Sequence, residues 1–296
     1  MNQFRWKSSV FAGFFILIFP LTGTSAVYGT AEKLEGEGFN SPKEVPVRDN
    51  KAPRELLHFL NSSAAGLKPP EVDKILWQLL SIQNKYLKFY EKQLCSDTIN
   101  LKINRYSLPE LMNIREIQEE NIKNLVRNIL ADGLILAFAE GMVYAEIDFS
   151  GISAHFGRYA SQPVAGYLRI MARETAGHFA EDAALKISPD TLGRRIVAIE
   201  TFRKENRRFP RQNELAQLAR KYFTTYMLGL NNTPAFRYQT NRLDGRFLRS
   251  YYDSVVIYPG TRFAACVKDY LKVLSENGFQ KTKPVLEFAV KTAANF

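Results

Sequence analysis

The sequence has few of the residues and motifs from which enzyme sites are built. It contains only three histidines and two cysteines among 296 residues, which leaves few side chains for metal binding or proton transfer. It has no Gly-x-Ser-x-Gly motif, no glycine-rich phosphate-binding loop and no paired-cysteine metal motif. We therefore expect no cofactor and no bound metal ion, and catalysis is not the leading hypothesis.

An apolar run, Val10 to Phe19, lies close to the N-terminus. Arg5 and Lys7 precede it without a nearby acidic residue, and Pro20 interrupts it. The run is too short to cross a bilayer, which takes about 20 apolar residues, and small residues follow it. The sequence therefore predicts a signal peptide over residues 1–26 and an exported protein, periplasmic or secreted. The alternative is an uncleaved membrane anchor.

The next segment, residues 27–66, is predicted to be a flexible leader. Glu, Lys, Gly, Pro and Asp are crowded within residues 32–54, with few large apolar side chains. Such a composition does not offset the entropy lost on ordering. After this leader we expect an N-terminal helical region, 67–188, and a C-terminal helical-repeat-like region, 189–296.

Apolar residues recur at helical spacing along most of the remaining chain. The pattern predicts helices at 70–94, 108–131, 162–175, 176–186, 189–208, 211–229, 243–257, 261–276 and 283–294. Two short apolar segments around Glu140-Gly141 predict a β-hairpin at 134–147, with a continued helix as the alternative. The predicted fold is mostly α, with helical hairpins packed as a short solenoid-like or bundle domain.

One pattern, a helix followed by Pro and a second helix, occurs twice. The second helices carry apolar residues spaced 4, 3 and 4 apart, which places them on one face: Leu215, Ala219, Tyr222 and Tyr226, then Phe263, Val267, Tyr270 and Leu274. The segment from Ile257 to Leu274, IYPGTRFAACVKDYLKVL, resembles the tetratricopeptide-like repeats of periplasmic helical-repeat proteins of bacteria. The resemblance covers residues 189–294.

This resemblance implies stacked helical hairpins that bind other molecules. The spacing departs from the family, because Pro210 and Pro259 are 49 residues apart and a tetratricopeptide unit has about 34. The alternative is an unrelated helical bundle whose turns contain proline.

The net charge of +10 is concentrated in one segment. Residues 194–249 contain 13 basic and 4 acidic side chains. The densest part supplies the predicted binding residues, Arg203, Lys204, Arg207, Arg208 and Arg211. Because arginine suits phosphates and carboxylates, we expect a protein or an anionic envelope component as partner. No nucleic acid is expected, since the chain has no recognisable nucleic-acid-binding motif. The alternative is a solvated helix face stabilised by Glu200 and Lys204 as an i,i+4 pair.

Cys95 and Cys266 are the only two cysteines of the chain. Because oxidising compartments favour pairing, export predicts a disulfide between them. The alternative is two separate reduced thiols.

The leading hypothesis is an exported interaction or scaffold protein of the cell envelope without catalytic activity. The alternative is an envelope hydrolase or metal-dependent enzyme. For that alternative, Glu174 and His178 fall at helical spacing with Glu181 or Asp182, and would present carboxylates beside an imidazole. Glu146, Asp148 and His155 are candidates to fold against the same face. Glu140 and Asp148 also flank the predicted hairpin as a carboxylate pair, which glycosidases require.

Overall fold

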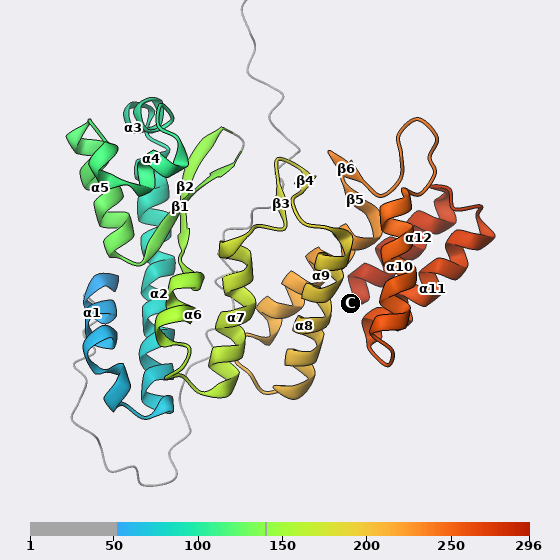
Figure 1. The fold of residues 1–296 in the computed structure, drawn as a ribbon, viewed down its shortest axis with the longest axis horizontal. Coiled ribbons are helices and arrows are strands. Elements are labelled where there is room, and N and C mark those ends of the chain that lie inside the picture. The colour runs from blue at the N-terminus through green and yellow to red at the C-terminus, as the bar shows by residue number, and fades with distance from the viewer. Residues whose placement is uncertain (1–51, 140) are drawn as a thin grey trace, which may run out of the picture. The chain divides into compact units, whose positions relative to one another are not determined.

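The computed structural model describes residues 52–139 and 141–296, and all of them belong to one unit, Arg48–Phe296. The predicted signal peptide lies outside the described residues. Both predicted helical regions, 67–188 and 189–296, fall within this unit. Its elements are mostly helices with small antiparallel strand pairs, as the sequence predicts (Figure 1). None of the helices described is long and apolar enough to cross a membrane.

The first half of the unit consists mostly of helices. They are α1 (Pro53–Ser63), α2 (Pro69–Leu94), α3 (Asp97–Ile103), α4 (Leu108–Met112), α5 (Glu120–Ala131), α6 (Phe149–Phe156) and α7 (Gln162–Ala176), with 3-10 turns η1 (Ala64–Gly66) and η2 (Ile114–Glu116). The apolar face of α2 is buried, and α1 packs against it. The predicted leader therefore ends too late. Pro53 begins a helix whose Leu56 and Leu60, at i,i+4 spacing, belong to the core.

The predicted helix 108–131 is divided into α4 and α5. Asn113 leaves the helical conformation at φ −102°, ψ 86°, and ends α4. The Tyr106 hydroxyl then accepts hydrogen bonds from the backbone amides of Gln118 and Glu119, at 3.0 and 3.4 Å. The intervening segment is held by these contacts and by the single 3-10 turn η2, in which the Glu116 amide donates to the Asn113 carbonyl at 2.8 Å.

The predicted hairpin is confirmed. Strands β1 (Leu134–Ala139) and β2 (Met142–Ile147) pair antiparallel, with Leu134 opposite Ile147 and Ala139 opposite Met142. Asp132, just before β1, is completely buried, and its carboxylate accepts from Arg54 Nε at 2.8 Å and from the Tyr90 hydroxyl at 2.6 Å. This buried carboxylate therefore joins α1 and α2 to the start of the hairpin.

The predicted helix at 176–186 is wrong. In its place are two short paired strands, β3 (Ala180–Glu181) and β4 (Ala184–Leu185). Asp182 and Ala183 between them have positive φ values of 47° and 55°. Positive φ at both central residues is the geometry of a tight two-residue hairpin turn, usually formed by Asn-Gly. Asp-Ala does not carry that signature, so the turn is not visible in the sequence.

The second half contains two helical hairpins and a final helix. Its elements are α8 (Pro189–Glu205), α9 (Gln212–Leu228), β5 (Gly229–Leu230), β6 (Thr233–Pro234), α10 (Gly245–Ile257), α11 (Arg262–Glu276) and α12 (Lys283–Asn295). α10 and α11 both pack against α8, and α12 packs against α9 and α11 (Figure 1). All eight apolar residues of the duplicated 4-3-4 pattern are buried, which confirms the predicted faces.

A layer of buried tyrosines joins the two hairpins. The Tyr226 hydroxyl lies 2.9 and 2.8 Å from the hydroxyls of Ser250 and Ser254 on α10. The Tyr251 hydroxyl donates to the carbonyls of Tyr226 and Met227, at 2.9 and 3.1 Å. The last carbonyls of a helix have no partner within it, so the Tyr251 hydroxyl completes the C-terminal end of α9.

The predicted disulfide does not form in the structure, where Cys95 and Cys266 are both free thiols. Cys95 ends α2 and is exposed, whereas Cys266 lies on α11 and packs beside the core. α2 belongs to the first half of the unit and α11 to the second, so the two thiols lie on helices that are far apart in the chain.

Candidate anion-binding site

A polar stripe runs along one face of α8. Glu200, Arg203 and Lys204 are spaced i, i+3 and i+4, which brings them to the same side at the C-terminal part of the helix, and Arg207 follows in the turn just after the helix ends. The apolar side of α8, which includes Ile196, Ile199 and Phe202, is buried in the core. Burial of that side turns the polar stripe outward. At 1.5 Å per residue the helical part of the stripe, from Glu200 to Lys204, is about 6 Å long.

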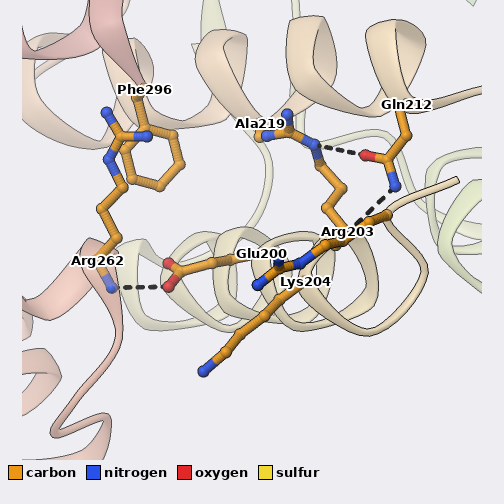
Figure 2. A pocket seen from close by; sticks show the side chains of 8 residues that line it. Glu200, Arg203, Lys204, Gln212, Ala219, Arg262 and Phe296 are labelled. Carbon is orange, nitrogen blue, oxygen red and sulfur yellow. Dashed lines mark hydrogen bonds between the residues drawn. The ribbon is translucent and has the colours of Figure 1, made fainter.

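This stripe forms one wall of a groove of about 460 Å³. Gln212 and Ala219 of α9 line the groove opposite it, and Arg262 and Phe296 lie at one end (Figure 2). The complete lining is Glu200, Arg203, Lys204, Arg207, Gln212, Ala219, Arg262 and Phe296. Four of these eight side chains are basic and one is acidic.

The guanidinium of Arg203 is held in place by Gln212. Its Nε donates to Gln212 Oε1 at 3.1 Å (Figure 2). Gln212 Nε2 donates in turn to the carbonyl of Asn206 at 2.5 Å. Asn206 is the residue that ends α8, so the anchor belongs to the turn itself. No described residue accepts a hydrogen bond from the two terminal nitrogens of Arg203. They remain as a planar pair of donors, which matches a carboxylate or a phosphate.

Glu200, the acidic side chain among the described residues of the groove, accepts hydrogen bonds from another helix, α11. Its two carboxylate oxygens accept the backbone amides of Arg262 and Phe263, at 2.7 and 2.9 Å. These amides belong to the first turn of α11, where negative charge is favourable and free N–H groups need acceptors. The predicted Glu200–Lys204 ion pair does not form. Lys204 is exposed and extends away from the other labelled side chains (Figure 2).

Arg262 is positioned at the end of the groove by α12 and the final residues. Its Nη2 donates to the carbonyl of Asn295 at 2.6 Å, and its guanidinium lies 5.6 Å from the ring centre of Phe296. Phe296 stacks in turn on Phe223 of α9, with ring centres 4.3 Å apart. The sequence did not indicate Arg262, because it lies far along the chain from the basic segment and only the packing of α11 on α8 brings it close.

The five predicted binding residues divide into two groups. Arg203, Lys204 and Arg207 line the groove, and Arg208 and Arg211 do not. Arg211 forms an ion pair with Glu214 at 3.2 Å and lies over the ring of Trp77, with 5.5 Å to its centre. It therefore joins α9 to α2. Arg208 is exposed and has no ion pair with any residue in the described ranges.

The residues of the enzyme hypothesis are dispersed among separate interactions. Glu140 lies outside the described residues. Asp148 accepts the backbone amide of Gly151 at 2.7 Å and begins α6. Together with His155, another candidate, it lines a second pocket of about 360 Å³, whose described lining includes neither Glu174 nor His178. Glu174 forms an ion pair with Arg195 of α8. The predicted helical face of Glu174, His178 and Glu181 is wrong, because α7 ends at Ala176.

His178 does have a carboxylate partner. Its Nε2 lies 3.0 Å from a carboxylate oxygen of Glu146 on β2, one of the residues expected to fold back. This hydrogen bond is the main reason that the pKa of His178 lies above its ordinary value. No cluster of three or more His, Cys, Asp or Glu side chains in the part of the chain that the structure describes is arranged to hold a metal ion.

Comparisons with protein-family models, with curated proteins and with solved structures found no match for this chain. The resemblance to tetratricopeptide-like repeats therefore remains a prediction from the sequence. We therefore infer the function from the groove, its charges and the helices that position them.

Proposed function

We propose that this protein is a helical interaction or scaffold protein of the cell envelope that holds an anionic partner in the groove between α8 and α9. The observation that carries the proposal is the excess of positive charge in that groove. Lys204 and Arg207 are exposed and have no ion pair with any described residue, while Arg203 and Arg262 are held beside them.

Like charges within about 10 Å repel one another, most strongly where salt does not screen them. An anion in the groove replaces this repulsion with attraction. Because Arg203 is anchored by Gln212, little of its side-chain freedom remains to be lost when it binds a ligand. These features favour binding of a partner with concentrated negative charge.

Several features favour binding over catalysis. The part of the groove lining that the structure describes contains no His, Cys, Ser, Thr, Tyr or Asp. Its carboxylate, Glu200, already accepts two backbone amides, so it is not free to act as a general base. The chemistry that remains is recognition of charge.

Location in the envelope rests on the predicted signal peptide, residues 1–26. N-terminal sequencing of protein recovered from the cells that produce it tests this part separately. We expect the mature chain to begin after the apolar run, and a chain that begins at Met1 would contradict export by a cleaved signal.

The binding site is tested by a pull-down from an envelope extract with matched variants. We compare Lys204→Ala/Arg207→Ala with Arg208→Ala/Arg220→Ala, which removes the same charge from exposed positions outside the groove. The first variant should lose the captured partner and the second should retain it. Capture should also weaken as salt rises from about 0.05 to about 0.5 M. Equal capture by the two variants would contradict the proposed site.

A further inference from the structure

The groove has a higher density of positive charge than a single carboxylate would match. Three arginines and one lysine line a groove of about 460 Å³, and the negative charge of Glu200 is shared with the first turn of α11. A carboxylate brings one charge, whereas a phosphomonoester brings about 1.5 to 2 charges and three acceptor oxygens in a small volume. We infer that the groove binds a terminal phosphate, either a phosphomonoester or a diphosphate. This inference rests on the proposed function, because it names the ligand of the same site.

The arrangement of donors fits this ligand class. Arg203 offers two coplanar terminal nitrogens, because Gln212 occupies its Nε. Lys204 follows on the same helix face and Arg207 in the turn after the helix, and both line the groove, so the donors extend over the length of a diphosphate. Arginine forks bind phosphate oxygens in pairs, and lysine adds a mobile point charge.

The lining also indicates which part of the ligand is recognised. Phe296 is the aromatic side chain of the groove, and it is only 8% exposed. Phe223 stacks on its ring, and the guanidinium of Arg262 lies over it. No face of this ring is open to stack on a nucleobase, which sequence-tolerant nucleic-acid binding requires. Recognition is therefore directed to the phosphate group, whether a soluble molecule or a lipid headgroup supplies it.

The test is calorimetric titration of the full-length mature protein with pyrophosphate and with citrate, a tricarboxylate of comparable charge. We expect pyrophosphate to bind at least about tenfold more tightly than citrate, a difference of about 1.4 kcal/mol. Lys204→Ala/Arg207→Ala should weaken pyrophosphate binding by about tenfold or more, and Arg208→Ala/Arg220→Ala by less than about twofold. Circular dichroism is used to check that both variants are folded, as we expect from their exposed positions.

Vesicles of phosphatidylcholine containing either phosphatidic acid or phosphatidylglycerol test whether a lipid headgroup or a soluble molecule supplies the phosphate. Binding to phosphatidic acid that pyrophosphate displaces assigns the groove to a lipid phosphomonoester, and binding of pyrophosphate alone assigns it to a soluble phosphate. Citrate binding equal to pyrophosphate binding would overturn the phosphate inference and leave the proposed function standing, as would a groove-dependent pull-down without any pyrophosphate binding. Pyrophosphate binding that both double variants retain equally would overturn the groove as the site, and with it both proposals.

Discussion

Glu200→Gln separates the two roles of the groove's acidic side chain. Glu200 accepts two backbone amides at the start of α11 and also lowers the positive charge of the groove. Glutamine keeps the size of the side chain but has one acceptor oxygen and no charge. We therefore expect the variant to be less stable than the wild type and to bind anions more tightly.

The loss of stability follows from the two hydrogen bonds. A hydrogen bond to a charged group contributes about 1.5–3 kcal/mol, and glutamine can keep one of the two in neutral form. The favourable interaction with the helix N-terminus, about 0.3–1 kcal/mol, is lost as well. The expected decrease is about 2 kcal/mol, which corresponds to a fall in Tm of about 4–8 °C for a domain of this size.

The assay is thermal unfolding followed by circular dichroism, with pyrophosphate titration of the same samples. Glu205→Gln is the matched control, because it removes the same charge from an exposed position of α8 outside the groove. We expect the control to change Tm by less than about 2 °C. If Glu200→Gln unfolds at the same temperature as the control, then Glu200 does not stabilise the start of α11 and our assignment of its role is wrong.

Three further predictions concern the framework. The raised pKa of His178 should fall toward its ordinary value in Glu146→Gln, as followed by NMR titration, and an unchanged value would exclude Glu146 as its partner. A raised folded-state pKa adds stability below the unfolded pKa of about 6.5 and loses it as pH rises through the folded pKa, so wild type should lose more stability than this variant between about pH 5 and 9. Gly229→Ala should cost at least about 2 kcal/mol in urea unfolding, because at φ 74° its Cβ would overlap the Ala235 amide. Gly260→Ala, with φ 82° and open space, should cost less, and an equal loss would show that the overlap is relieved. Cys95 should react quickly with a thiol reagent without reductant and Cys266 slowly, because burial raises the pKa of Cys266; no free thiol would contradict the structure.

Local signals predicted most of the helices well. Pro69 and Pro189 stand at the first positions of α2 and α8, where proline costs no hydrogen bond. The 4-3-4 spacing identified the buried faces of α9 and α11 because burial on a helix repeats with its turn. Two elements, α1 and the β3–β4 hairpin, were not predicted from the sequence. α1 begins at the end of the polar segment 32–54 and only two of its leucines are deeply buried, and the β3–β4 turn uses residues that seldom adopt positive φ.

The candidate site was predictable only in part, because charge in a sequence does not show which side chains face one another. Arg207 and Arg208 are adjacent and chemically identical, yet only Arg207 lines the groove. Arg211 lies in the same basic segment, but it forms an ion pair with Glu214 and lies over the ring of Trp77. Arg262 joins the groove through tertiary packing alone, which no local pattern encodes.

The most direct test of the account is the affinity of Arg207→Glu for pyrophosphate beside that of Arg208→Glu. Both variants change the net charge by the same amount at neighbouring exposed positions, so any general effect of charge is shared. If the groove binds anions, Arg207→Glu should weaken binding by at least about tenfold more than Arg208→Glu, a difference of about 1.4 kcal/mol or more. Equal loss in the two variants would mean that the protein attracts anions through its overall charge, and the groove would not be a binding site.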